Sequence, residues 1–362
     1  MEFEAFFKKI TAHQAKELPF VVYRKPHQNS IKGFFQNDNK VYTTNEYIEE
    51  GFVFAPFDSS RQTVFFPSEK SDFLESRRPL LSKNEIVENS TTIVESVADK
   101  QHHIALVDKG VDAIQTETFQ KVVLSRQLSI RKREPISNEE IISLFKKLET
   151  LYPTAFVYCW FHPKVGLWLG ATPERLVSIV DATINTMALA GTQKYTEKNT
   201  IVWGEKERKE QQLVTDFIVN ALQLVSLDIS VSETVNHRAG QLIHLKNEIT
   251  AVLSKNKTIK NVVEQLHPTP AVCGLPKEKA QQFILKYEGY ERSFYTGFLG
   301  ECNISDSEND ALKTDFYVNL RCMNIDRNTI YIYVGGGITK DSNAESEWQE
   351  TVNKAQTMLA VL

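Results

Sequence analysis

The sequence lacks the features that mark zinc-ribbon, secreted and membrane proteins. Its four cysteines, Cys159, Cys273, Cys302 and Cys322, lie far apart and form no Cys-x-x-Cys pair, so neither a zinc site nor a disulfide framework is expected. No apolar run approaches the ~20 residues of a membrane-spanning helix. The first twenty residues carry acids and lysines too early for a secretory signal. We therefore expect a cytoplasmic protein with no membrane partner.

Positive charge is not in excess either. The chain has 42 Lys and Arg against 46 Asp and Glu, a formal net charge of −4, and no basic stripe interleaved with aromatics. This balance argues against a nucleic-acid partner and leaves small molecules as the expected ligands. With 362 residues, 41% of them hydrophobic, the chain can bury a large core. We expect it to act as a monomer.

The first 110 residues are dominated by short apolar runs. Residues 1–17 predict a helix. The β-rich runs that follow are broken by Asn, Asp, Pro and Ser and predict a meandering antiparallel sheet; they span residues 18–26, 40–44, 52–57 and 63–67. The polar stretch 83–109, which becomes helical, is the predicted soft boundary. It divides residues 1–110 from a longer region, residues 111–362, within one intertwined domain.

From Thr118 onward the predicted elements are longer. Apolar residues at Ile141, Leu144, Phe145 and Leu148 predict an amphipathic helix over 138–153. The other predicted helices are 205–225, 259–266, 277–287 and one from 343, and the predicted strands are 119–130, 154–161, 166–172, 176–189 (a pair), 230–240, 241–250, 315–326 and 329–338. Neighbouring strand pairs with separate helices indicate an α+β fold. The glycines at 335–337 lack Gly-x-Gly-x-x-Gly spacing, which argues against a dinucleotide fold.

Two predicted helices carry paired carboxylates. Ser342 and Glu345 match a capping box, which predicts that the last helix starts there. On that helix Glu347, Glu350 and Lys354 share one face, as a solvated salt-bridge face also would.

In the earlier helix Glu207 and Glu210 again share a face. Two such helices can hold a hard cation between them, and Mg²⁺ prefers oxygen ligands. Four carboxylates brought together without a cation would repel one another. The sequence therefore predicts Mg²⁺ as cofactor.

Other polar and glycine residues have two interpretations each. Gly335, Gly336 and Gly337 could let backbone N–H groups approach an anion, or form a bulge or tight turn. Arg321, expected in mid-strand among apolar neighbours, needs a carboxylate from a ligand or from the protein.

Two further residues could carry acid–base chemistry. Lys121 in a strand-like segment would serve as a base if it points inward, because desolvation favours the neutral amine, or would be an ordinary strand lysine if it points outward. Glu174, after a proline, could be a general acid or a surface residue.

The motifs together resemble the chorismate-utilising enzymes: isochorismate, salicylate, anthranilate and aminodeoxychorismate synthases. The resemblance runs from about Thr118 to the C-terminus. It is carried, in family order, by FQKVVLSR, GATPERL, LAGT, KERKEQ, IHL, HPTPAVCG, RSFYTGFLG, LRC and GGGI followed by two glutamates and a lysine. It implies a large fold of two mainly antiparallel sheets packed in the interior with helices outside. It also implies that residues 111–362 form the chorismate-binding catalytic region and that residues 1–110 are the variable N-terminal part of the same fold.

The resemblance also implies a role for each matched residue. Lys121 matches the base that activates water for attack at C2 of chorismate, and Glu174 matches the acid that protonates the leaving C4 hydroxyl. Glu210 and Glu350 match the primary Mg²⁺ ligands, with Glu207 and Glu347 in support. The remaining matches are substrate-binding positions: Arg321, Tyr295, Gly335, Gly336 and Gly337 around the enolpyruvyl carboxylate, and Gly191, Thr192, His244, Ala271 and Lys354 elsewhere.

Within the family the motifs resemble those of the enzymes that use water, and so imply an isochorismate synthase that feeds menaquinone or siderophore biosynthesis. Lys121 stands where anthranilate synthases typically carry glutamine, and Ala190 stands where aminodeoxychorismate synthases have a lysine nucleophile. No glutaminase domain or subunit is expected. Gln211, where the family usually has histidine, and Phe298, where many members have proline, depart from the pattern. The alternatives are a salicylate synthase and a non-catalytic chorismate-binding subunit that needs a glutaminase partner.

Overall fold

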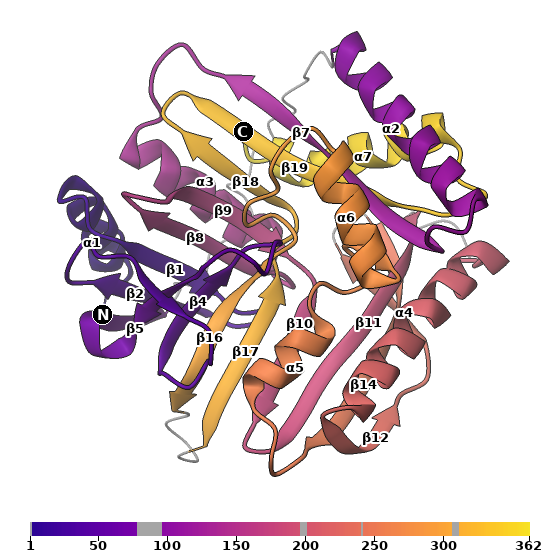
Figure 1. Cartoon of the computed structure of the whole chain (residues 1–362). Helices are drawn as coiled ribbons and strands as arrows, with labels where there is room; N and C mark the ends of the chain where they lie inside the picture. The colour runs from indigo at the N-terminus through magenta and orange to yellow at the C-terminus, as the bar shows by residue number, and fades with distance from the viewer. Residues whose placement is uncertain (1, 78–95, 196–200, 240–241, 306–310) are drawn as a thin grey trace.

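Two large antiparallel sheets pack against each other in the computed structural model, which describes residues 2–77, 96–195, 201–239, 242–305 and 311–362 (Figure 1). The first sheet contains, in spatial order, β15 (Gly274–Leu275), β7 (Lys121–Arg131), β19 (Thr329–Ile338), β18 (Cys322–Asp326), β9 (Gly166–Thr172), β8 (Phe156–His162), β1 (Phe20–Arg24), β2 (Ser30–Gln36) and β6 (Ser71–Arg77). The second contains β12 (Ser226–Val231), β14 (Leu242–Leu253), β11 (Thr183–Lys194), β10 (Arg175–Val180), β17 (Leu312–Val318), β16 (Phe298–Ser305), β4 (Gly51–Ala55), β5 (Thr63–Pro67) and β3 (Tyr42–Thr44), with β13 (Val235–Ala239) also paired to β14. This arrangement confirms the predicted α+β fold with two antiparallel sheets.

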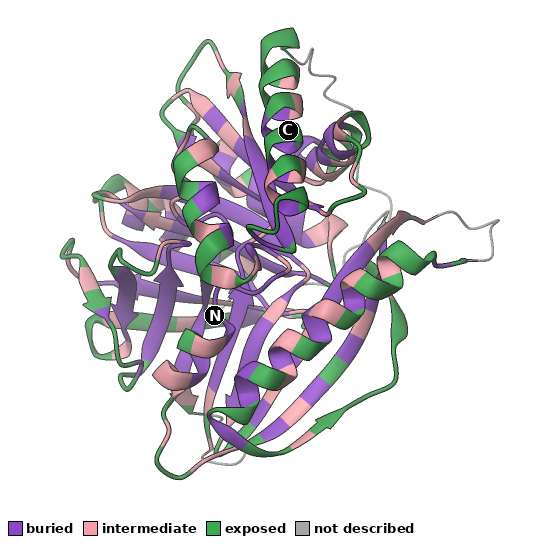
Figure 2. Ribbon diagram, turned by 45° about the vertical axis from the view of Figure 1, so that its right-hand side comes forward, coloured by how far each residue is buried: buried purple, intermediate pink, exposed green. Residues whose placement is uncertain are grey.

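Helices cover the outer faces of both sheets. Over the first sheet lie α1 (Phe3–Ala15), α3 (Asn138–Leu151) and α7 (Ala344–Leu359); over the second lie α4 (Glu205–Gln223) and α5 (Ile259–Leu266); α2 (Val97–Gln115) and α6 (Lys277–Tyr287) pack at β7, and a single turn, η1, spans Ser68–Lys70. In α3 the predicted apolar face is buried, and the hydroxyl of Ser137 caps the helix by accepting from the Glu140 N–H. Figure 2 shows the buried interior and the exposed outer sides of the helices. No helix in the described ranges is long and apolar enough to cross a membrane.

Aromatic side chains fill the space between the sheets. Phe54 of β4 stacks on Phe294 with ring centroids 4.1 Å apart and lies 4.9 Å from Trp160 of β8. Tyr158 and Tyr317 are buried in the same cluster. Large rings bury much apolar area and prefer such offset and tilted contacts. The cluster fixes the two sheets together next to the turn that follows Phe294.

The sheet pairing differs from the sequence prediction in several places. The N-terminal strands do not form one meander: β1, β2 and β6 join the first sheet, whereas β3, β4 and β5 join the second. Strands β2, β6, β15 and β16 were not predicted. The strand predicted over 230–240 is two strands, β12 and β13. The strand predicted over 315–326 is also two, β17 and β18, which belong to different sheets.

The start of the last helix is also corrected. Asn343, not Ser342, is the N-cap of α7, and its side chain accepts from the N–H of Ser346. Ser342 instead donates to Glu347. In the predicted boundary segment, residues 83–95 lie outside the described ranges, and α2 covers the rest.

Candidate active site

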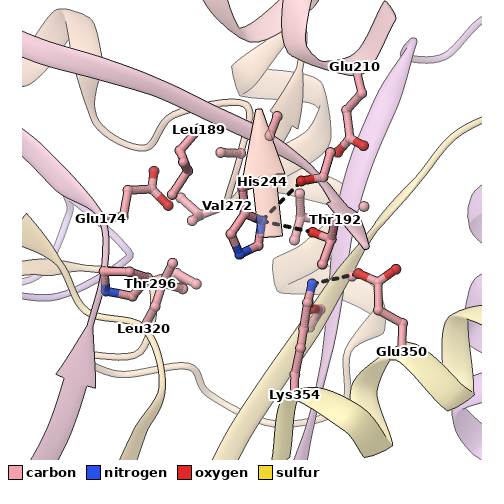
Figure 3. Close-up of a pocket in the computed structure, with 18 of the residues that line it drawn as sticks. Glu174, Leu189, Thr192, Glu210, His244, Val272, Thr296, Leu320, Glu350 and Lys354 are labelled. Carbon is pink, nitrogen blue, oxygen red and sulfur yellow. Dashed lines mark hydrogen bonds and ion pairs between the residues drawn. The ribbon is translucent and has the colours of Figure 1, made fainter. Parts of the chain in front are cut away.

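A polar pocket lies where the two sheets, α4 and α7 meet (Figure 3). Most residues proposed from the sequence line it: Glu174, Gly191, Thr192, Glu207, Glu210, His244, Ala271, Tyr295, Arg321, Gly335, Gly336, Gly337, Glu350 and Lys354. The two others, Lys121 and Glu347, lie directly behind this lining, where they contact Glu210, Gly336 and Gly337. The structure therefore brings together residues that are more than 230 positions apart in the chain.

Lys121 points into the protein. Its side chain, at the start of β7, is only 1% exposed, and its Nζ donates to Oε1 of Glu210 at 2.8 Å. Gly337 packs against both groups: a Cβ there would lie 3.1 Å from Cε of Lys121 and 3.2 Å from Oε1 of Glu210. The outward-facing strand lysine, the alternative interpretation, is excluded.

Glu174 is a buried carboxyl at the pocket wall. It follows β9 and Pro173, and its carbonyl oxygen accepts from the Val318 N–H at 3.0 Å, which anchors it to β17. Burial raises the pKa of Glu174 to about 7, although the charges of Arg321 and Lys121 act in the opposite direction. A carboxyl with this pKa can donate a proton near neutral pH.

The carboxylates of α4 and α7 meet at the glycines of β19. A Cβ at Gly336 would lie 3.3 Å from Oε2 of Glu347 and 3.5 Å from Oε1 of Glu350, while Gly337 contacts Glu210. These glycines are extended residues inside β19, paired with β7, so they form neither a bulge nor a turn. The absence of a side chain is what lets the acids of both helices approach the strand.

Lysines neutralise these acids in the structure. Lys354 lies 2.6 Å from Oε1 of Glu350, and Lys206 lies 3.6 Å from Oε1 of Glu347. Burial opposes ionisation of Glu210, but the charge and hydrogen bond of Lys121 outweigh it and lower the pKa of Glu210. Among the described residues, no three His, Cys, Asp or Glu side chains lie close enough together to hold a metal ion in their present positions.

The donor set nevertheless fits a hard cation. Burial and then the neighbouring charge of Glu350 raise the pKa of Glu347, as expected for carboxylates that are crowded together. All the candidate donors are carboxylate oxygens, the ligands that Mg²⁺ prefers. Glu207, Glu210, Glu347 and Glu350 are therefore the residues that would hold it.

Arg321 is not in mid-strand as predicted. It lies in the break between β17 and β18 with φ 46°, where the chain passes from the second sheet to the first. Its guanidinium lines the pocket, and no carboxylate in the described ranges forms an ion pair with it. A pocket cation with no ion-pair partner among the described residues is suited to an anionic ligand.

His244 presents a neutral nitrogen to the pocket. Its Nδ1 lies 3.0 Å from the carbonyl oxygen of Gly191 and 3.2 Å from Oγ1 of Thr192 (Figure 3). A carbonyl can only accept, so Nδ1 carries the hydrogen and Nε2 is an acceptor. Nε2 is buried with no hydrogen-bond partner in the described part of the chain. Burial, then the charge of Arg321, lowers the pKa of His244 to about 3.

Several lining residues were missed by the sequence analysis. They are Val123, Pro173, Leu189, Ala190, Lys206, Val272, Thr296 and Leu320. Each is within a few residues of a predicted site residue, and most lie inside the quoted motifs, so proximity to a motif was the available signal. The sequence could have indicated Lys206, because this charged residue lies one position before Glu207 in the acidic helix.

Curated proteins match this chain over 71–75% of its length. Isochorismate synthase MenF of Escherichia coli strain K12 is 30% identical over 281 residues, which cover 75% of this chain and 63% of that protein. Isochorismate synthase DhbC of Bacillus subtilis strain 168 is 30% identical over 270 residues, 71% of this chain and 66% of that protein. The chain thus spans just under two thirds of the length of these two curated relatives.

The fold extends over nearly the whole chain. The solved structure of the menaquinone-specific isochorismate synthase MenF from Escherichia coli matches with a TM-score of 0.77 and 22% sequence identity, covering 95% of this chain and 88% of that one. The family model described as chorismate binding enzyme matches residues 37–362. This protein therefore belongs to the family of chorismate-binding enzymes.

Proposed function

We propose that this protein is an isochorismate synthase, which adds water at C2 of chorismate and expels the C4 hydroxyl. The observation that carries the proposal is that two buried groups, the amine of Lys121 and the carboxyl of Glu174, lie at the same pocket. Figure 3 shows Glu174 on one side of the pocket and Glu210, the hydrogen-bond partner of Lys121, on the other. The names of the two curated relatives support the same activity.

In the proposed reaction the two groups move protons at opposite positions of the ring. For this step Lys121 acts as the neutral amine, not as the ammonium paired with Glu210, and it accepts a proton from the attacking water as the water oxygen bonds to C2. The ring double bonds shift, and Glu174 donates its proton to the C4 hydroxyl, which leaves as water. The number of atoms balances, since one water enters and one departs. In the reverse direction Glu174 and Lys121 exchange roles, as microscopic reversibility requires.

The rest of the pocket binds the two substrate carboxylates. We assign the enolpyruvyl carboxylate to Arg321, which forms no ion pair with a carboxylate of the described residues, and to Tyr295; both line the pocket. Bound Mg²⁺, held by Glu207, Glu210, Glu347 and Glu350, would supply Lewis-acid polarisation at the ring carboxylate. The remaining lining residues close the cavity around the ring.

One incubation tests this proposal. Purified protein is mixed with chorismate and Mg²⁺, without glutamine or ammonia, and the products are separated by chromatography. Formation of isochorismate is the expected result. Salicylate, recognised by its fluorescence, would instead identify a salicylate synthase, and no conversion would favour a binding subunit that needs a glutaminase partner. We further propose that the product enters menaquinone or siderophore biosynthesis in the cytoplasm, with the chain acting as a monomer.

A further inference from the structure

Thr296 adopts a backbone conformation that its side chain disfavours. It lines the pocket beside Tyr295, and its φ is 60°. For a β-branched residue this left-handed conformation is a true outlier, and such outliers persist only where surrounding contacts over-determine them. Ser293, three positions earlier in the same turn, also has a positive φ, 50°. The turn 292–296 therefore needs an external support.

Three sets of hydrogen bonds hold Thr296. Its N–H donates to the carbonyl of Asn319 at 2.9 Å, and its own carbonyl accepts from Nε2 of His267 at 3.1 Å. Its Oγ1 accepts from NH1 of Arg292 at 3.1 Å and donates to the carbonyl of Tyr295 at 2.6 Å. Among the described residues, Arg292 is the only one outside the Tyr295–Thr296 pair that hydrogen-bonds to the Thr296 side chain.

The guanidinium of Arg292 has an acceptor for each of its five donors. NH1 donates to Thr296 and to the carbonyl of Val272 at 2.9 Å, and NH2 donates to the carbonyl of Val123 at 2.7 Å. Nε and NH2 also donate to the two oxygens of Glu288, at 2.7 and 2.5 Å. Arg292 is 3% exposed. This planar five-donor fork is unique to arginine.

The acceptors of Arg292 belong to separate walls of the pocket. Val123, which lies on β7 two residues after Lys121, lines the pocket. Val272, which follows Ala271 in the loop before β15, and Thr296 line it too (Figure 3). Glu288 extends the network, because it accepts from both the N–H and the hydroxyl of Ser125 at 2.8 Å. One buried side chain thus joins three lining segments that are distant in sequence.

We propose that Arg292 is a positioning residue: its guanidinium holds Thr296 in the left-handed conformation and ties that turn to Val123 and Val272. Arg292 does not touch the reacting atoms; it acts through the walls that surround them. Its expected effect on turnover rests on the proposed function, whereas its effect on the turn does not. A lysine at this position keeps a positive charge beside Glu288 but has all its donors on a single nitrogen. The acceptors lie around three separate nitrogens of Arg292, so a lysine cannot bond to all three walls.

The test compares Arg292→Lys with Arg24→Lys. Arg24 is a matched control because it is 2% exposed and its guanidinium donates to the carbonyls of Tyr152 and Pro153, neither of which lines the pocket. Arg292→Lys should lower kcat/KM on the order of 10²-fold, the effect expected from an ångström-scale misplacement of pocket walls. Arg24→Lys should leave kcat/KM within about threefold, even if both variants lose similar thermal stability.

Two further measurements separate positioning from general stability. Amide hydrogen exchange in residues 292–297 should speed up in Arg292→Lys and stay unchanged in Arg24→Lys. Glycine adopts a positive φ freely, so a Thr296→Gly variant should depend less on Arg292. Arg292→Lys should therefore lower kcat/KM by a smaller factor in the Thr296→Gly background than in the native protein.

Equal activity losses in the two lysine variants, or unchanged exchange over 292–297, would overturn the proposal. If the wild-type protein does not convert chorismate, the proposed function fails, and the exchange comparison alone decides whether Arg292 holds the turn.

Discussion

The Nζ of Lys121 and the Oε1 of Glu210 lie 2.8 Å apart, so the proposed base and a proposed metal ligand are bonded to each other. Gly337 packs against both, and Glu350 lies at the next glycine along β19. A cation that binds Oε1 of Glu210 competes with Lys121 for that oxygen. The base and the metal site are therefore one connected structure, and a change in either alters the surroundings of the other.

Replacement of Lys121 by alanine should remove the base. We expect Lys121→Ala to lower kcat for isochorismate formation by roughly 10²–10⁴-fold, the usual contribution of a general base, with the circular dichroism spectrum unchanged. Lys132→Ala is the control, because Lys132 follows the other end of β7 and pairs with Glu140 near the surface. Chromatographic initial rates are the measurement, and near-normal turnover by Lys121→Ala would exclude it as the base.

Glu350→Ala should weaken Mg²⁺ binding. Loss of one carboxylate from the donor set is expected to raise the Kd for Mg²⁺ by about tenfold or more, measured by isothermal titration calorimetry and by the Mg²⁺ dependence of the rate. Glu345→Ala is the control on the same helix, since Glu345 is exposed and pairs with Lys100. An Mg²⁺ titration of Glu350→Ala that matches wild type would refute the metal assignment.

The pH dependence of turnover should report Glu174. Burial raises its pKa to about 7, and the proposed mechanism needs the protonated acid. The kcat/KM for chorismate should therefore fall as pH rises through about 7, because kcat/KM reports ionisations of the free enzyme. In Glu174→Gln the rate should be far lower and this descending limb should vanish. A limb that persists unchanged in Glu174→Gln would belong to another group.

The stability of the fold should show the same ionisation. Between the ordinary pKa of 4.5 and the folded-state pKa of about 7, the folded protein binds more protons at Glu174 than the unfolded chain. The free energy of unfolding therefore decreases as pH rises through this window. The side chain in Glu174→Gln does not titrate. The free energy of unfolding of this variant, relative to that of wild type, should therefore rise by up to about 3 kcal/mol between pH 4.5 and 8. Urea unfolding at both pH values measures this, and a gap independent of pH would contradict it.

His244 should stay neutral in the folded protein. Burial and Arg321 lower its pKa to about 3, so its ring should not titrate between pH 5 and 8. A nuclear magnetic resonance titration of the His244 Cε1 proton, assigned with His244→Gln, measures this directly. A transition of the His244 signal near pH 6.5 would show that Nε2 is not the fixed acceptor that the hydrogen bond to Gly191 requires.

The residues of the pocket were predictable because short motifs carry them. The i,i+3 spacing of Glu207 and Glu210, and of Glu347 and Glu350, follows from helix geometry alone, and the structure places both pairs at the pocket. The hydrogen bond between Lys121 and Glu210 could not be foreseen, because it joins β7 to α4 across 89 positions of sequence.

The sheet topology was harder to predict for a related reason. Strand pairing is decided by contacts between distant segments, and nothing local tells which sheet a run such as β4 joins. Strand β6 is a largely exposed edge strand without a clear apolar alternation, so it gave no signal. Arg321 sits among apolar neighbours that favour a continuous strand, and its positive φ is imposed by the crossing between sheets.

The order of strands has a consequence for biosynthesis of the protein. β18 and β19 lie between β9 and β7 in the first sheet, and β16 and β17 lie between β4 and β10 in the second. The nascent chain therefore holds four unsatisfied sheet edges until residues 298–338 leave the ribosome. Such edges invite pairing with other chains. We expect fragments that stop before β16 to aggregate.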